Sequence, residues 1–232
     1  PSLESPHDVA SATRAAPATD LATVARTLLQ RYPKRTLVAL ALMVSQAFLY
    51  NAIFFTEALV LATFFGVPSG RVGLYIFPFA LGNLLGPLVL GPLFDRIGRK
   101  PMIALTYLGS SALLVATGLL FVRGWFDATT IALAWSLVFF FASAGASAAY
   151  LTASEIFPLA TRSSAIALIY AFGTLAGGVA APALFGALIA THTRGAVFAG
   201  YLVGAALMAA AGLVELWFGI EAARRPLEEI AP

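Results

Sequence analysis

Long uncharged stretches, separated by short clusters of charged residues, dominate this sequence. Six apolar runs have the length of about 20 residues that an α-helix needs to cross the hydrocarbon core of a bilayer. The predicted spans are 36–65, 72–94, 102–122, 129–153, 164–190 and 196–219. The pattern therefore predicts an all-α membrane protein with a six-helix transmembrane domain over residues 36–219.

The two ends of the chain lack this pattern. Residues 1–20 are rich in Ala, Ser, Thr and Pro and show no apolar period, which is typical of a flexible segment. Residues 21–31 have the spacing of a short amphipathic surface helix, and a basic collar follows at 32–35. We expect 1–35 to be a partly disordered cytoplasmic central-loop segment and 220–232 to be a cytoplasmic tail.

Composition supports a lipid environment and excludes several other classes of protein. Hydrophobic residues make up 60% of the chain and charged residues 11%, against about 25% charged in soluble domains. The sequence has no Cys and no Ser-His-Asp, HExxH or phosphate-loop pattern, so we expect neither an enzyme nor a metal or cofactor site. The net charge of +3 is explained by loop anchors, and we expect no nucleic-acid partner.

The positions of the basic residues predict the orientation. If both chain ends lie inside, the outer loops hold Arg71, Arg123 and Arg194, and the inner segments hold the other eleven of the 14 Lys and Arg residues. Cytoplasmic loops are enriched in Lys and Arg. We therefore expect an integral protein of the plasma (cytoplasmic) membrane with both ends of this chain in the cytoplasm.

The turn GPLFDRIGRK, residues 91–100, joins the second and third predicted spans. Its bases alone would fit ordinary positive-inside anchors. Asp95 does not, because an acid at the end of an apolar helix gains nothing from the inside rule and needs a basic partner. The whole pattern, G-x-L-x-D-R-x-G-R-K, resembles the loop signature of the major facilitator superfamily.

Two further stretches extend this resemblance. YLTASEIFPLATR, residues 150–162, carries Glu155 and Arg162 in an E-x6-R arrangement similar to that of sugar porters and related metabolite symporters. Glu221, followed by PLEEI, resembles a degraded sugar-porter tail. Their order implies the carboxy-terminal six-helix half of a twelve-helix transporter, which would have an amino-terminal six-helix half as its partner.

The charged residues at the inner helix ends suggest a cytoplasmic gate. The network would consist of Asp95, Arg96, Arg99, Glu155 and Arg162. One partly buried pair contributes only about 0–1 kcal/mol, but several pairs that form only in the closed state can bias a two-state equilibrium. We expect neutralisation of Arg162 or Glu155 to favour the inward-open state.

Polar residues within the spans are candidates for substrate contact. SQAFLYNAIFFTE, residues 45–57, resembles the sugar-porter helix-seven pattern, which implies substrate-binding roles for the amides of Gln46 and Asn51. Tyr150 takes the place of that family's stacking Trp. Leu49 replaces the Gly of the family pattern and Phe55-Thr56 its Tyr pair, so the sequence favours a small polar solute, sugar-like or an organic acid, without naming it.

Glu57 has no counterpart in the sugar-porter pattern. On a regular helix it lies within about 40° of Gln46 and Tyr50, on a face that would line a cavity. It could bind substrate or a coupling proton, reach water near the outer surface, or pair with another helix. Asn51 lies about 140° from Gln46, so both would face the substrate only if the helix breaks. Glu215, near the end of the last span, is expected to reach the interface.

The sequence thus predicts secondary active transport of a small polar metabolite by alternating access, with a proton as the coupling ion and no other cofactor. The alternative is a membrane scaffold or receptor that has the same fold and does not transport. The cost of inserting polar residues such as Gln46 and Glu57 into a membrane argues against this alternative.

Overall fold

The computed structural model describes residues 21–221, which form helices and no strands. Six helical segments are long and apolar enough to cross a membrane, which confirms the predicted fold class. The helices are α3 (Pro33–Phe54), α5 (Val72–Ile97), α6 (Arg99–Val122), α7 (Ala128–Glu155), α8 (Leu159–Gly173) continued by α9 (Ala180–Ala190), and α10 (Arg194–Phe218). Two shorter helices are α2 (Leu21–Arg31) and α4 (Glu57–Phe65). The expectations for residues 1–20 and 222–232 lie outside the described residues.

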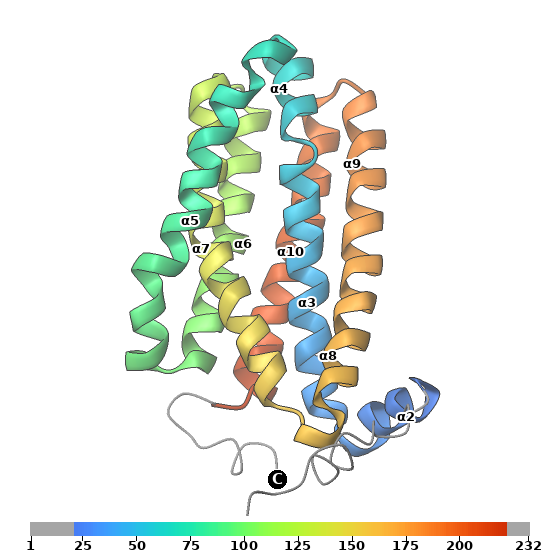
Figure 1. Ribbon diagram of the computed structural model, residues 1–232. Helices are drawn as coiled ribbons and strands as arrows, with labels where there is room; N and C mark the ends of the chain where they lie inside the picture. The colour runs from blue at the N-terminus through green and yellow to red at the C-terminus, as the bar shows by residue number, and fades with distance from the viewer. Residues whose placement is uncertain (1–20, 222–232) are drawn as a thin grey trace, which may run out of the picture.

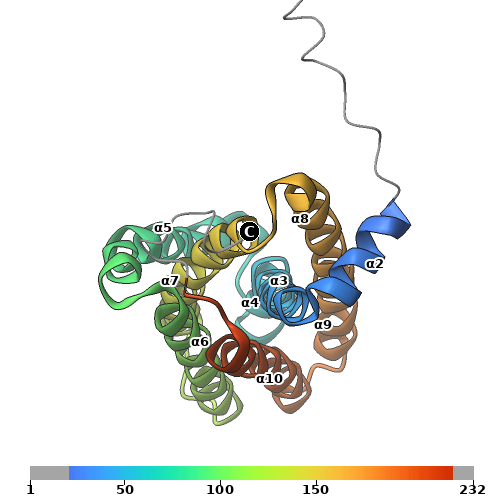
Figure 2. The same ribbon diagram turned by 90° about the horizontal axis from the view of Figure 1, so that it is seen from below.

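The six spans run side by side, with α3 in the middle of the bundle (Figures 1 and 2). α7, α8, α9 and α10 surround α3, while α5 packs along α7, and α6 packs along α7 and α10. α2 and the end of α10 lie at the same end of the bundle, at the bottom of Figure 1. We call this the basic end, because the described bases of α2, the start of α3 and the α5–α6 and α7–α8 turns gather there, and we call the other the far end.

The first predicted span, 36–65, is two helices in the structure. α3 ends at Phe54, and α4 begins at Glu57 after a two-residue turn. Within this turn the Thr56 hydroxyl donates to the Ala52 carbonyl. α4 then stops at Gly66, whose φ of 65° is left-handed and suits glycine. The break changes the direction of every side chain beyond Phe54.

The fifth span contains a π-helical turn, η2 (Thr174–Val179), between α8 and α9. Its glycines allow a close approach to α3, because a Cβ on Gly177 would overlap the backbone of Phe48 and Val44. In the same way Gly86 of α5 lies against the Phe140 carbonyl of α7. Small residues of this kind let helix backbones pack closely in membranes.

A capping box fixes the start of α7 at the far end. The Asp127 carboxylate accepts a hydrogen bond from the Thr130 backbone N–H at 2.7 Å, and the Asp127 N–H donates to the Thr130 hydroxyl at 2.9 Å. The hydrogen bond from Thr130 N–H lowers the pKa of Asp127 below its ordinary value.

Candidate functional site

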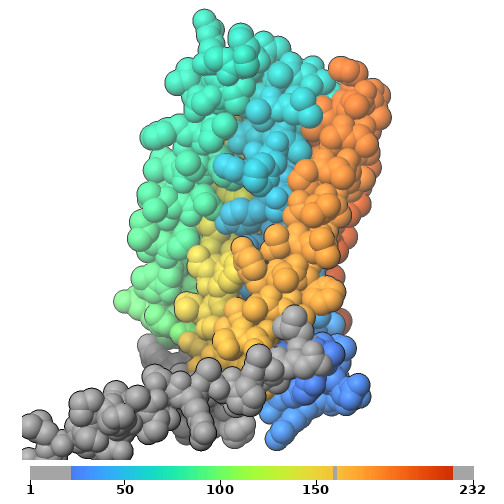
Figure 3. Space-filling view, turned by 45° about the vertical axis from the view of Figure 1, so that its right-hand side comes forward, coloured from blue at the N-terminus to red at the C-terminus, as the bar shows by residue number. Residues whose placement is uncertain are grey.

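One side of α3 is partly open along the membrane-spanning part of the bundle. Its partly exposed side chains are Ala47, Tyr50, Asn51 and Phe54. At 100° per residue these four fall within an arc of about 100°. Figure 3 shows α3 set back between α5 and α9, with α7 next to it lower down. We call this arc the open strip.

Two polar pairs lie along one edge of the open strip. The Gln46 Nε2 donates to the Tyr150 hydroxyl of α7 at 3.5 Å, and the Tyr50 hydroxyl donates to Asn83 Oδ1 of α5 at 2.7 Å. Gln46 is 9% exposed, and its Oε1 is buried without a hydrogen-bond partner among the described residues. A buried acceptor without a donor is unfavourable, so a donor that reached this oxygen after a local rearrangement would be bound favourably.

Asn51 lies on the opposite edge of the open strip. Its Nδ2 donates to the Ala47 carbonyl one turn earlier at 2.7 Å, and the Asn51 amide lies beside Gly178 of η2. α3 is continuous between Gln46 and Asn51. Because the helix does not break, the two amides lie on opposite edges of the open strip, about 140° apart on a regular helix.

Tyr150 is 41% exposed, and its ring lies 6.1 Å from that of Tyr170 on α8. Two phenols from neighbouring helices thus stand beside the Gln46 amide. Tyr170 was not identified from the sequence, because a lone Tyr in a long apolar run has no distinguishing neighbour. Asn83 is an amide in the middle of a span, which needs a polar partner, and the Tyr50 hydroxyl of α3 is that partner.

Glu57 does not share a face with Gln46 and Tyr50, because the turn at Phe55 and Thr56 redirects it. The Glu57 side chain is 0% exposed, and neither carboxylate oxygen has a hydrogen-bond partner among the described residues. It interacts electrostatically with Tyr201 of α10.

Three arginines from three helices contact consecutive residues at the end of α7. The contacts are Arg99 of α6 with the Glu155 carboxylate, Arg35 of α3 with the Ile156 carbonyl oxygen (2.6 Å), and Arg162 of α8 with the Phe157 carbonyl oxygen (3.1 Å). Helix carboxyl ends carry unpaired carbonyls and a partial negative charge, which cations stabilise. We call this group the arginine clamp.

The structure brings together part of the predicted charge network. Arg99 and Glu155 form an ion pair with side chains 18% and 22% exposed. Arg162 contacts a backbone carbonyl, whereas Asp95 and Arg96 are exposed and form no ion pair within residues 21–221. The basic partner expected for Asp95 is therefore not found in this part of the chain.

Glu221 completes the basic end. Its carboxylate accepts hydrogen bonds from the backbone N–H groups of Arg99 (2.9 Å) and Lys100 (3.2 Å), at the start of α6. The amino end of a helix binds anions favourably. The chain segment after α10 is thereby tied to the turn between α5 and α6, where Gly98 has a φ of 116°.

Sequence reasoning missed Arg35 and did not identify the contact made by Glu221, because their partners are backbone groups that leave no mark in the sequence. The one feature of the sequence that could have indicated these contacts is Pro158, between α7 and α8. Proline has no N–H, so a backbone carbonyl near the end of α7 is left without a donor and can accept from a basic side chain. Glu215 was placed wrongly: it is 0% exposed and does not reach the interface. Within residues 21–221 no cluster of His, Asp or Glu could hold a metal ion.

A comparison with family models finds a match over residues 8–232 to the model described as "Sugar (and other) transporter". The match covers nearly the whole chain, including all six spans, the open strip and the arginine clamp. The search of curated individual proteins gives no match.

Proposed function

Because this chain belongs to the Sugar (and other) transporter family, we propose that it carries a small polar metabolite across the plasma membrane by alternating access, with the basic end in the cytoplasm. The observation that supports this most directly is the polar edge of the open strip. Gln46, Tyr50, Asn83 and Tyr150 come from three helices and meet within the membrane-spanning part of the bundle. Polar side chains at this depth are costly in lipid, which makes a binding role the expected one.

The hydrogen-bonding groups at this edge indicate the kind of solute. Gln46 Oε1 needs a donor, and the Tyr150 hydroxyl, which accepts from Gln46 and also has Tyr170 as a partner, could exchange one of these contacts for a solute. A solute with several hydroxyl groups satisfies both, because each hydroxyl donates and accepts. Sugars and hydroxylated organic acids have this chemistry, and the tyrosine rings offer a flat apolar surface for a sugar ring.

The open strip needs a cover to form a site. Tyr150 and Tyr170 are 41% and 51% exposed, and contact between their hydroxyls and lipid tails would be unfavourable. We propose that a second six-helix bundle, the amino-terminal half of the same transporter, packs over this side. The solute would then bind between the two halves, where such transporters place their substrates.

The test is counterflow of labelled sugars and hydroxy acids into proteoliposomes that contain the full-length protein. Loss of one neutral hydrogen bond costs about 0.5–1.5 kcal/mol. Gln46→Leu and Tyr150→Phe should therefore each raise the half-saturation concentration roughly 2- to 10-fold. Tyr75→Phe is the matched control, since Tyr75 lies in the first turn of α5 at the far end. Absence of counterflow with every solute would overturn the proposal and favour the scaffold or receptor alternative.

We also propose that Glu57 binds the coupling proton. Its carboxyl group is fully buried without a hydrogen-bond partner in the described structure, an environment that strongly favours the neutral acid over the carboxylate. Loss of the proton would require water or a cation beside Glu57, and therefore movement of α4. Proton binding and the position of α4 would in this way be linked.

Glu57→Gln keeps the shape of the neutral acid and cannot titrate. We expect it to abolish uptake driven by a pH gradient while counterflow, which needs no gradient, continues. Glu215→Gln is the control, because Glu215 is equally buried but lies near the basic end. Gradient-driven uptake that survives Glu57→Gln would rule out this role and leave the proposal of solute transport intact.

A further inference from the structure

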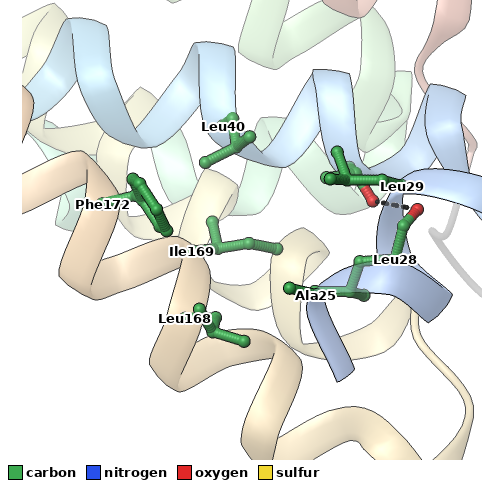
Figure 4. Close-up of a pocket in the computed structure, with 8 residues that line it drawn as sticks. Ala25, Leu28, Leu29, Leu40, Leu168, Ile169 and Phe172 are labelled. Atoms are coloured by element: carbon green, nitrogen blue, oxygen red, sulfur yellow. Dashed lines mark hydrogen bonds between the residues drawn. The ribbon is translucent and has the colours of Figure 1, made fainter. Parts of the chain in front are cut away.

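An apolar groove lies where α2 meets the bundle, on the side of α3 and α8 (Figure 4). Its volume is about 280 Å³. Ala25 and Leu29 of α2, Leu40 of α3, and Leu168 and Phe172 of α8 line it. Leu29 and Phe172 are 63% and 58% exposed, so the groove is open to its surroundings. Its size is slightly below that of typical small-molecule pockets, of about 300 Å³ or more, and fits a single slender apolar group.

No free polar atom inside the groove would recognise a polar ligand. Its one polar lining residue is Thr36, whose hydroxyl lies 2.9 Å from both the Leu28 and the Tyr32 carbonyl oxygens. The Thr36 hydroxyl is therefore already hydrogen-bonded and does not offer its proton to a ligand. Its contact with the Leu28 carbonyl also links the end of α2 to α3 and holds the two walls of the groove together.

The groove lies at the depth of acyl chains. Leu40 is seven residues beyond Pro33, which places it roughly 10 Å along α3 from the basic end. Since the hydrocarbon core is about 30 Å thick, this depth lies within the leaflet at the basic end. α2 itself lies at the foot of the bundle, where a surface helix would meet the headgroups (Figure 1).

Two exposed bases of α2 flank the groove. On a helical wheel the apolar arc of α2 is flanked by Arg26 on one side and Arg31 on the other, and both are exposed. Lys34 and Arg35 follow at once, and no Asp or Glu occurs between Leu21 and Thr56. Lys34 lies over the Phe218 ring and Arg35 contacts the Ile156 carbonyl oxygen. Arg26 and Arg31 are therefore the bases left for an anionic lipid headgroup, which exposed bases beside a membrane-spanning helix attract.

We propose that this groove binds an anionic phospholipid of the leaflet at the basic end. One acyl chain lies between α2, α3 and α8, and Arg26 and Arg31 hold the phosphate-bearing headgroup. The apolar lining accounts for the chain, and Arg26 and Arg31 account for the charge, so neither a sugar nor a neutral lipid fits both parts equally well. The bound lipid would hold α2 against the bundle.

The first test is native mass spectrometry of the purified full-length protein, titrated with dioleoyl phosphatidylglycerol or dioleoyl phosphatidylcholine. Each base near the headgroups contributes about a fivefold preference for anionic lipid. We therefore expect at least fivefold more retention of phosphatidylglycerol, and its loss in Arg26→Gln/Arg31→Gln. Arg71→Gln/Arg123→Gln removes the same charge at the far end and should retain the lipid. Equal retention of the two lipids, or equal effects of the two double variants, would overturn the proposal.

The second test addresses the groove. Ala25→Trp should fill it and reduce lipid retention several-fold, whereas Leu105→Trp, at an exposed position on α6, should not. A photo-reactive benzoylphenylalanine at position 29 gives an independent result if Ala25→Trp does not fold. A cross-link to phosphatidylglycerol supports the proposal. A cross-link to protein instead, in the same chain or in another molecule, would show a different occupant and refute it.

Discussion

The arginine clamp shows how single side chains hold a helix end in this protein. Arg35, Arg99 and Arg162 each contribute one contact to the last residues of α7 and the turn after it. Charged donors to backbone carbonyls and carboxylates form stronger hydrogen bonds than neutral ones. Because the three arginines come from three helices, movement of any of these helices relative to α7 must break at least one contact.

Removal of the Arg99–Glu155 pair should therefore favour a bundle that is open at the basic end. A pair exposed by about a fifth contributes at most about 1 kcal/mol, so Glu155→Gln should shift the equilibrium by no more than about fivefold. The measurement is the rate of thiol labelling of Ser147→Cys, which lines a cavity with Arg99. This chain contains no Cys of its own that would be labelled.

Lys34→Gln is the control for this measurement, because Lys34 is exposed at the same end and lies over the Phe218 ring rather than beside an acid. The exchanged pair Arg99→Glu/Glu155→Arg should restore the slow labelling rate. Labelling that is unaffected by Glu155→Gln would show that the pair does not contribute to closure.

At the scale of elements, the packing of α5 on α7 depends on glycine. A Cβ at Gly86 would overlap the Phe140 carbonyl oxygen, which belongs to a helix backbone and cannot turn aside. Gly91, on the same helix, has no atom within 4 Å of the corresponding position. The two glycines therefore differ in what a methyl group would meet.

Gly86→Ala should destabilise the protein by about 1–3 kcal/mol, the usual cost of overpacking. Gly91→Ala should be neutral or stabilise by up to about 1 kcal/mol, since alanine restricts the unfolded chain more than glycine does. Thermal unfolding in detergent, followed by helical circular dichroism, distinguishes the two variants. Equal stabilities would mean that α5 and α7 are less closely packed than the structure indicates.

Elements were easier to predict from the sequence than directions of side chains. The six spans follow from apolar length, which only a bilayer or a large core would require. The helix face predicted for Glu57 was wrong, because the prediction assumed a regular helix through Phe55 and Thr56. Glu215 was misplaced because a position near a helix end does not reveal which side of the helix is covered by neighbours.

At the scale of the whole molecule, the charge distribution predicts orientation. Within the described residues eight Lys and Arg lie at the basic end, and Arg71, Arg123 and Arg194 lie at the far end. In intact cells a membrane-impermeant thiol reagent should label Ser69→Cys at the far end and leave Gln30→Cys unlabelled until the cells are opened. The reverse pattern would invert the topology and place the arginine clamp outside.

Family membership could be predicted from the sequence because its motifs lie in loops, where charges stand out against an apolar background. The binding edge could be predicted only in part. Comparison with a known family pattern identified Gln46, Asn51 and Tyr150. The packing of α5 and α8 in the bundle is what brings Asn83 and Tyr170 to the same edge. Contacts that depend on the arrangement of several helices leave no local pattern.

The contact between Glu221 and the start of α6 has a practical consequence for protein production. A shortened version that ends at Phe218 would retain all six spans but lose the anion on the Arg99 and Lys100 N–H groups. Affinity tags and crystallisation fusions joined directly to the last helix would have the same effect. Tags and fusion partners should be attached beyond Glu221, so that the purified protein keeps the contact between Glu221 and the start of α6.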